Sequence, residues 1–266
     1  MKLTKNKFFL LLALAGLGIA TPDAKAVTTY SDGDILVGFH ATGGTGNTKE
    51  VVVDLGSYNQ FVGLAANTTF TLSVASISGD LTAAYGSPLA TALARTDLFW
   101  GAMGNDGITD IFATRARTSP DTQSTPWTVQ DYFTTQAAMN TVSTVGNNYA
   151  GRTSGSSTAV TTETTATGTW TSFAPLIGQN PNNFLPTGTA GIDGNAPGSS
   201  TLDLFRIDGQ ENGLDGPSTY LGKLTLNSTT GQFSFSNSVV AVPEPSRAIL
   251  LVFGLTGVVL RRRRKA

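Results

Sequence analysis

The sequence predicts a mainly β fold: a single β-sandwich-like domain with one or two accessory helices, plus a short helix at each end of the chain. Two observations predict the β-rich domain. Short runs of β-branched and aromatic residues recur along the chain, and turns rich in Gly, Asn and Thr separate them. The terminal helices are predicted because an apolar run beside Lys or Arg residues stands at each end.

The first β-prone runs are Ile35–Phe39 and Glu50–Leu55. Residues 41–47 between them are rich in Gly, Thr and Asn, which predicts a hairpin. Thr69–Val74 alternates polar and apolar residues, as a half-buried strand does. Leu81–Ala94 is rich in Ala and Leu and predicts a short helix, broken near Gly86-Ser87-Pro88.

A second hairpin is predicted at Leu98–Met103 and Ile108–Ala113, because Asn105-Asp106-Gly107 between them is a strong turn signal. Trp127–Tyr149 is the best helix candidate, with apolar residues three or four positions apart. Residues 152–172 are dominated by Thr, Ser, Gly and Ala, and fit a surface loop, a Thr-rich edge strand or a flexible insert. Strand character returns at Leu202–Ile207, Tyr220–Asn227 and Gln232–Ser236. Together these elements predict one β-rich domain over residues 27–241.

The composition excludes two classes of function. The chain has no Cys, so it has no disulfide, no thiolate nucleophile and no Cys-based metal site. Between residues 27 and 242 it carries 7 basic and 16 acidic residues, which gives a formal net charge of −9. A phosphate backbone repels such a surface, so we expect no nucleic-acid partner.

The first 26 residues have the three parts of a secretory signal, in order. Three lysines precede Phe8–Ala20, an apolar run of 13 residues. Ala24 and Ala26 are the small residues of a small-x-small cleavage site. Signal peptidase is therefore an expected partner, and the mature chain is expected to start at Val27.

The last 25 residues, 242–266, are typical of a membrane-held tail. Pro243, Glu244 and Pro245 stop any preceding strand and leave an extended, accessible segment. Ala248–Leu260 is apolar apart from Thr256. As a short transmembrane helix it covers about 20 Å of the ~30 Å hydrocarbon core. A basic cluster follows, which extends the usable span and holds this end in the cytoplasm: Arg261, Arg262, Arg263, Arg264 and Lys265.

This ending resembles the PEP-CTERM sorting signal of exosortase-processed bacterial proteins. Pro243-Glu244-Pro245 is the complete motif of that family, and the apolar run and the Arg cluster follow it in the family's order. The resemblance implies that an exosortase-type membrane peptidase recognises the motif and removes the apolar tail. It also implies an inner-membrane-tethered intermediate, then a place at the cell surface or in the extracellular matrix of an exopolysaccharide-producing, biofilm-forming bacterium.

No catalytic constellation is legible in the body, and we expect no catalytic residue. His40, the only histidine, ends a strand beside a Gly-rich turn, where a structural or solvent-facing role is expected. A glycosidase needs two carboxylates on either side of a sugar, and the sequence alone pairs no two acids in space. The acids available for such a pair include Asp54, Asp80, Asp97, Asp106 and Asp110.

Residues 208–216 form the densest acidic loop, and oxygen ligands in a Gly-rich loop suit Ca²⁺. Asp208, Glu211 and Asp215 are its candidate ligands. The EF-hand pattern fails, because Gln210 and Thr219 stand where acidic ligands are needed. We therefore expect a polar turn and no cofactor, with Ca²⁺ as the alternative. The short acidic pair formed by Asp32 and Asp34 has the same expected role.

Three functions fit these observations. The preferred one is an exported, non-enzymatic surface or matrix protein that associates with exopolysaccharide. The second is a carbohydrate-binding, lectin-like module, with or without Ca²⁺, in which Trp100, Trp127 or Trp170 stacks on sugars; tryptophans scattered in this way are more often core residues. The third is a secreted hydrolase, which requires two carboxylates in one cleft.

Overall fold

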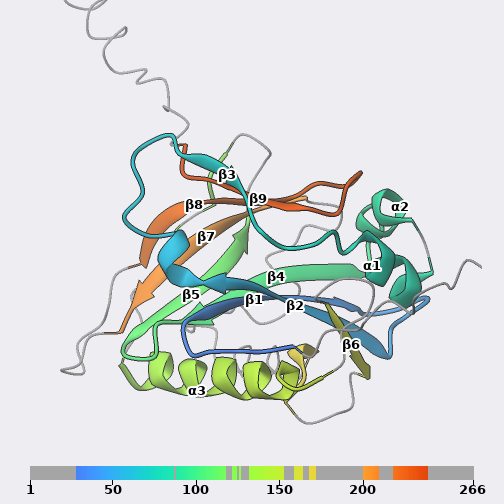
Figure 1. Cartoon of the computed structure of the whole chain (residues 1–266), viewed down its shortest axis with the longest axis horizontal. Helices are drawn as coiled ribbons and strands as arrows, with labels where there is room; N and C mark the ends of the chain where they lie inside the picture. The colour runs from blue at the N-terminus through green and yellow to red at the C-terminus, as the bar shows by residue number, and fades with distance from the viewer. Residues whose placement is uncertain are drawn as a thin grey trace, which may run out of the picture.

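The structure, a computed structural model, describes residues 28–86, 88–117, 122–124, 126, 132–152, 159–163, 168–171, 200–209 and 218–238. The predicted signal and transmembrane helices, the cleavage site and the sorting tail lie outside these residues. Figure 1 labels the elements in chain order: β1 (Asp34–Ala41), β2 (Lys49–Ser57), the 3-10 helix η1 (Tyr58–Gln60), β3 (Thr69–Thr71), α1 (Ser78–Tyr85), α2 (Leu89–Leu93), β4 (Leu98–Asn105), β5 (Asp110–Ala116), α3 (Tyr132–Tyr149), β6 (Val160–Glu163), β7 (Thr201–Asp208), β8 (Ser218–Leu226) and β9 (Phe233–Ser236).

Within the described residues, nine strands form one sheet, in the order β3-β9-β8-β7-β5-β4-β1-β2-β6. Every pair of neighbouring strands is antiparallel. The prediction of a mainly β domain is confirmed. Its sandwich-like part needs correction, because these strands form one continuous sheet where a sandwich has two. The described residues also hold three α-helices instead of one or two, since the predicted helix at Leu81–Ala94 is split into α1 and α2.

The single sheet curls until distant strands face each other across its interior. Strands β4 and β9 are four places apart in the sheet order. The ring centroids of Trp100 on β4 and Phe233 on β9 nevertheless lie only 6.1 Å from each other. In a flat sheet, four spacings of about 4.8 Å would put the two strands about 19 Å apart. In Figure 1, β8 and β9 accordingly lie on the other side of the interior from β1 and β2. The curl thus encloses a core in the way that the second sheet of a sandwich would.

The apolar side chains inside the curl form what we call the inner core. Alternate residues of β1 point into it: Ile35, Val37 and Phe39. Phe233 and Phe235 of β9 belong to the same cluster. Helices α1 and α2 cover one end of this core with six of their side chains, namely Leu81, Ala84, Tyr85, Leu89, Ala92 and Leu93.

Helix α3 covers the opposite face of the sheet, as Figure 1 shows. Its buried side chains include Ala138, Val142 and Val145. They belong to a second apolar cluster, the outer core, which also contains sheet residues such as Leu36 and Phe205. Strand β1 is therefore buried on both faces, which explains why its sequence is apolar at consecutive positions.

The two predicted hairpins are confirmed at β1–β2 and β4–β5, and β8 and β9 form a further antiparallel pair. In the second hairpin, one carboxylate oxygen of Asp106 accepts hydrogen bonds from the backbone N–H groups of Ile108, Thr109 and Asp110, each at 2.8 Å. A turn signal read from the sequence is thus a side-chain cap in the structure. Within the Thr-rich stretch, residues 160–163 form β6 at an edge of the sheet, as in the edge-strand alternative.

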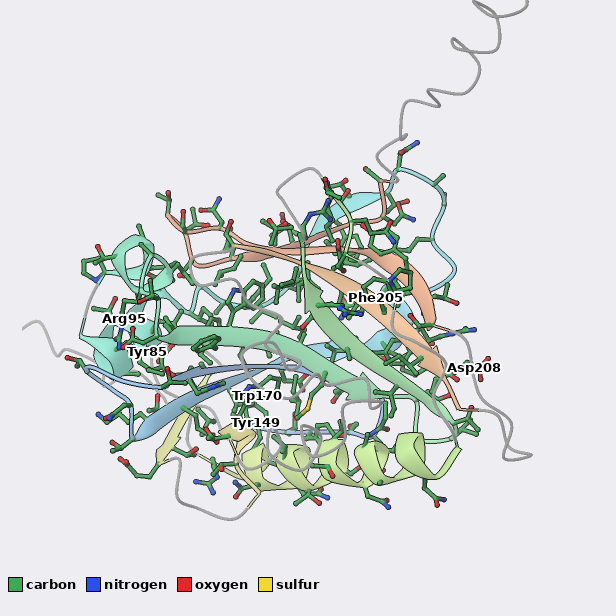
Figure 2. All side chains as sticks on the ribbon, turned by 180° about the vertical axis from the view of Figure 1, so that it is seen from behind. Tyr85, Arg95, Tyr149, Trp170, Phe205 and Asp208 are labelled. Carbon is green, nitrogen blue, oxygen red and sulfur yellow. The ribbon has the colours of Figure 1, made fainter. Side chains whose placement is uncertain are left out.

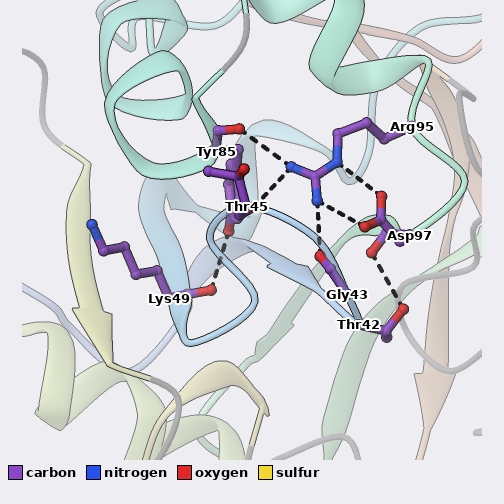
Figure 3. Close-up of polar contacts among 7 residues, drawn as sticks. All are labelled: Thr42, Gly43, Thr45, Lys49, Tyr85, Arg95 and Asp97. Atoms are coloured by element: carbon purple, nitrogen blue, oxygen red, sulfur yellow. Dashed lines mark hydrogen bonds and ion pairs between the residues drawn. The ribbon is translucent and has the colours of Figure 1, made fainter.

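An arginine network joins the β1–β2 loop to the helices at the end of the inner core (Figure 3). The Arg95 guanidinium donates two hydrogen bonds to the Asp97 carboxylate, both 2.8 Å long. It also donates to the carbonyl oxygens of Gly43 at 2.9 Å and of Thr45 at 2.8 Å. The hydrogen bond between Arg95 and Asp97 raises the pKa of the guanidinium and lowers that of the carboxyl. One side chain therefore fixes a loop that the backbone alone does not tie to the helices.

A glycine in β1 admits the indole ring of Trp170. A Cβ atom placed on Gly38 would lie 1.8 Å from a ring carbon of Trp170, far inside any van der Waals contact. The backbone N–H groups of Trp170 and Thr171 donate to the buried Glu50 carboxylate at 2.8 and 2.9 Å. The side-chain hydroxyls of Thr162 and Thr171 donate to it at 3.0 and 3.1 Å. Glu50 thus holds the segment that places this ring over the sheet.

Among the described residues, no helix is both long and apolar enough to cross a lipid bilayer.

Replacing Arg95 by Lys is expected to lower the free energy of unfolding by about 1–3 kcal/mol. Lysine keeps the charge but cannot bond the carboxylate with two parallel N–H groups while reaching the two loop carbonyls. Urea denaturation measures the change. Arg206→Lys is the matched control, because its guanidinium is 38% exposed and lies 3.4 Å from the nearest oxygen of Asp110. The control should change stability by less than about 0.5 kcal/mol; equal effects in the two variants would refute the role given to Arg95.

Replacing Gly38 by Ala is expected to destabilise the fold by about 2 kcal/mol or more, because the added methyl group must displace the Trp170 ring from its packed position. Gly43→Ala is the control, since the nearest atom to its new Cβ, a carboxylate oxygen of Asp97, lies at 3.5 Å. Thermal unfolding of both variants gives the comparison. A Gly38→Ala protein as stable as the control would show that the ring does not lie over this glycine.

Candidate functional site: a polar cleft beside Asp54

A cleft with a volume of about 730 Å³ opens on the described surface. It lies where the start of the described chain, the end of β2, η1, the segment after β3 and the end of α3 come together. Its lining residues are Thr28, Thr29, Asp54, Leu55, Gly56, Ser57, Asn59, Gln60, Ser73, Val74 and Tyr149. Pockets that hold small-molecule ligands usually measure about 300–1,000 Å³, so this cleft is large enough for one.

A β-bulge in β2 forms one wall of the cleft. Asp34 pairs with Ser57 and Leu36 pairs with Asp54, so two residues of β2 stand opposite one residue of β1. The second of these two residues is Gly56, at a φ of 85° that favours glycine. Its N–H group donates to a carboxylate oxygen of Asp54 at 2.6 Å. Bulges are common beside functional sites because they redirect a side chain out of the regular pleat, and here the bulge fixes the Asp54 side chain.

Asp54 is the acid of the cleft, and a second acid stands next to it. Burial raises the pKa of the Asp54 carboxyl to about 7, although the Gly56 N–H bond lowers it. The negative charge of Asp34 and a side-chain hydrogen bond between the two carboxyls raise it further. Near neutral pH, Asp54 is thus protonated in part of the molecules, and it can donate as well as accept a hydrogen bond.

Tyr149 closes the cleft from the last turn of α3. Burial raises the pKa of its phenol to about 12, with a smaller contribution from the charge of Asp54. The phenol therefore stays protonated at neutral pH. The Tyr149 carbonyl oxygen accepts a hydrogen bond from the Thr28 hydroxyl at 2.6 Å, and Thr28 also exchanges backbone hydrogen bonds with Gly151 and Arg152. The beginning of the described chain is thus tied to the end of this helix.

The rest of the wall consists of hydroxyl and amide side chains. Gln60 donates one amide hydrogen to the Leu55 carbonyl oxygen at 2.7 Å, which holds the side chain against the bulge. Asn59 donates to the Ser57 hydroxyl at 3.2 Å. Among the described lining residues, none is Lys, Arg or His. The cleft therefore offers hydrogen bonds and apolar contacts but no positive charge.

The histidine and the tryptophans that the sequence analysis considered have structural positions. His40 stacks on Phe99, with ring centroids 5.6 Å apart, and it lies at the end of β1 away from Asp34. Trp100 and Trp170 are each only 1% exposed, so the prediction that they are core residues is confirmed. A stacking role on sugars is wrong for these two. Trp127 lies outside the described residues.

Most of the single acids are engaged within the fold. Asp97 pairs with Arg95, Asp106 caps a turn, and Asp110 lies 3.4 Å from Arg206. Asp80 is buried in the first turn of α1. Of those acids that the structure describes, Asp54 alone lines the cleft.

The candidate calcium ligands are only partly described. Asp208 lies at the end of β7, with a carboxylate oxygen 4.0 Å from the Arg206 guanidinium. Figure 2 shows it at the opposite end of the molecule from Tyr85 and Arg95, and away from Tyr149. Glu211 and Asp215 lie outside the described residues. Within the part of the chain that the structure describes, no group of three or more His, Cys, Asp or Glu side chains is placed to hold a metal ion.

Sequence reasoning missed the cleft as a unit. It singled out Asp54 and Asp34 separately, but it did not pair them. The Asp54-Leu55-Gly56 run at the end of a strand was a usable signal, since Asp and Gly at that place are typical of a turn or bulge. No local signal could have brought Tyr149 or Ser73 to the same place, because both arrive through the packing of distant elements.

Replacing Asp54 by Asn is expected to flatten the pH dependence of stability and to raise the melting temperature at about pH 8. The folded pKa of about 7 lies above the ordinary value of 3.8. Between pH values of about 4 and about 7, the Asp54 carboxyl is protonated in the folded state but ionised in the unfolded state. The free energy of unfolding therefore falls as the pH rises through this range. Asparagine cannot ionise, and it removes this loss. Melting temperatures at about pH 5 and about pH 8 measure the effect.

Asp97→Asn is the contrasting variant for this experiment. The pKa of the Asp97 carboxyl is lowered in the folded state. The ionised carboxylate therefore stabilises the fold above a pH of 3.8, and this stabilisation is lost as the pH falls through the folded-state pKa. This variant should lose stability at about pH 8, opposite in sign to Asp54→Asn. A drop in melting temperature at about pH 8 for Asp54→Asn would contradict the burial of a protonated acid in the cleft.

Comparisons of the chain with protein-family models, with curated proteins and with solved structures find no match.

Proposed function

We propose that this chain is an exported, non-enzymatic protein of the cell surface or extracellular matrix, sorted by its C-terminal tail. One observation carries the proposal: two apolar runs flanked by basic residues, at residues 8–20 and 248–260, bracket a β-rich body. The order at the second run, Pro-Glu-Pro, apolar segment and Arg cluster, is that of the PEP-CTERM signal. The first run has the features of a secretory signal, and the second has those of a sorting signal. Both kinds of segment are recognised by the export machinery.

Hydrogen bonds near both ends of the body are compatible with this arrangement. Thr28, two residues after Ala26, is hydrogen-bonded to the end of α3. At the other end, Asn237 donates a backbone hydrogen bond to Thr68. Four residues separate Ser238 from Pro243. Processing at Ala26 and near Pro243 would therefore remove none of the residues that form the sheet or its two cores.

Processing would follow in two steps. Signal peptidase cuts after Ala26 and releases the body outside the inner membrane, while the basic cluster at residues 261–265 holds the tail in the cytoplasm. An exosortase-type peptidase then recognises Pro243-Glu244-Pro245 and separates the body from its membrane segment. The product joins the surface or the exopolysaccharide-rich matrix of the biofilm. The net charge of −9 over residues 27–242 fits a polar, uncharged environment better than a nucleic acid.

The hydrolase alternative is less well supported by the lining of the cleft. A glycosidase needs two carboxyl groups, one on either side of a sugar. Among the described lining residues, Asp54 is the one acid.

Mass spectrometry of the protein recovered from the producing cells and their medium tests the proposal. We expect the mature form to start at Val27 and to end near Pro243. Replacing Pro243, Glu244 and Pro245 together by Ala should leave the tail on the protein and keep it in the membrane fraction. Val239→Ala, a change just before the motif, is the matched control and should be processed normally.

Two results would contradict the proposal. A protein that retains Met1 in the cytosol would exclude export. A mature wild-type protein that still ends at Ala266, with the triple Ala variant located in the same fraction, would exclude sorting by the motif.

A further inference from the structure

The buried carboxylates of Glu50 and Asp203 are satisfied by hydrogen bonds within the fold. The Glu50 carboxylate accepts from Thr162, Trp170 and Thr171. The buried Asp203 carboxylate pairs with Arg117 and accepts from the Ser124 N–H group. Such carboxylates hold structure together and leave little for a ligand. The cleft beside Asp54 differs, because its polar groups face an open volume of about 730 Å³.

We propose that this cleft binds a neutral ligand rich in hydroxyl groups, namely a short stretch of an uncharged polysaccharide. The inference goes beyond the proposed function and does not rest on it, because it depends on the lining of the cleft and not on the tail. Three properties of the lining carry it: its hydrogen-bonding groups, its charge and its apolar wall.

The hydrogen-bonding groups offer both donors and acceptors at one place. The Gln60 side-chain amide donates one of its two hydrogens to the Leu55 carbonyl oxygen. The same amide also has a second hydrogen and an acceptor oxygen. Ser73 is exposed, and its hydroxyl both donates and accepts. The partly protonated Asp54 carboxyl has the same double capacity near neutral pH. A sugar hydroxyl also donates and accepts, so it can pair with every one of these groups.

The charge of the lining disfavours ionic ligands. Asp54 is the acid among the lining residues, and the described lining contains no basic side chain. An anionic ligand would have to approach the Asp34–Asp54 pair without a positive partner, which is unfavourable. A cationic ligand would find Asp54 already partly neutralised by its proton. An uncharged ligand has neither difficulty.

The apolar wall consists of Leu55, which is buried, and Val74, which is partly exposed. Sugars present C–H groups on one face of the ring and hydroxyls at its rim. Wall and polar groups together therefore match a sugar better than a wholly apolar or a wholly ionic ligand. Mixed linings with a few placed polar groups are the usual form of small-molecule sites.

The test is titration calorimetry with the full chain in mild detergent near pH 7. The neutral probes are cellohexaose, maltohexaose and mannohexaose, and the charged ones are hexagalacturonate and a chitosan hexamer. We expect at least one neutral hexamer to bind with a Kd below about 10 mM, a weak affinity typical of a few hydrogen bonds. Both charged hexamers should bind at least about fivefold more weakly than the best neutral one.

Two variants locate the site. Gln60→Ala and Ser73→Ala should each raise the Kd for the best neutral hexamer by roughly five- to tenfold, as expected for the loss of one or two hydrogen bonds. Gln232→Ala, in the exposed turn before β9, is the matched control and should bind within about twofold of the wild type. Melting temperatures confirm folding, and Ser73 is exposed enough that its change should leave the fold intact.

Three outcomes would overturn the inference. No neutral hexamer binds below about 10 mM; a charged hexamer binds as tightly as the best neutral one; or both cleft variants bind like Gln232→Ala. This assay does not depend on tail processing. A negative binding result would therefore not contradict the sorting proposal, and an unprocessed tail would not contradict binding in the cleft.

Discussion

The curl of one antiparallel sheet is the constraint on which the rest of the structure depends. A sheet of nine strands buries apolar residues on a face only if something covers that face. Here the sheet covers itself, and Trp100 of β4 meets Phe233 of β9 across the inner core. Helices α1 and α2 are needed only at the end of the curl, and α3 covers the other face. One charged side chain, Arg95, then fixes the loop beside the small helices.

The cleft is a consequence of the same geometry. Where β2 leaves the curl, a bulge at Leu55 and Gly56 breaks the pleat and turns Asp54 toward Asp34 and Tyr149. An acid that is half-buried beside another acid keeps its proton to about pH 7, which makes it a hydrogen-bonding group more than a charge. A binding role for an uncharged ligand and a non-enzymatic role for the whole chain are therefore compatible. Each rests on different residues.

Local patterns predicted most of the strands but not how they come together. The hairpin at Asn105-Asp106-Gly107 was predictable because a few residues determine a turn, and the break at Gly86-Ser87-Pro88 separates α1 from α2. A single curled sheet was not predictable, since sandwich and curl share the same alternation of residues and differ only in which strands pair. Asp54 was visible as an acid, but its partner Tyr149 reaches it through α3, and no local pattern encodes that packing. The roles of the two chain ends stay predictions from sequence alone.

Native-state hydrogen exchange tests the central claim, that one continuous sheet closes on one inner core. The account predicts that backbone amides of β1, β4, β7 and β8 share the slowest exchange, with one common free energy of opening, because they belong to one cooperative unit. Arg95→Lys should lower that common value in both halves of the sheet. Two separate opening free energies, one for β1, β2 and β6 and another for β7, β8 and β9, would contradict a single curled sheet and favour two independent ones.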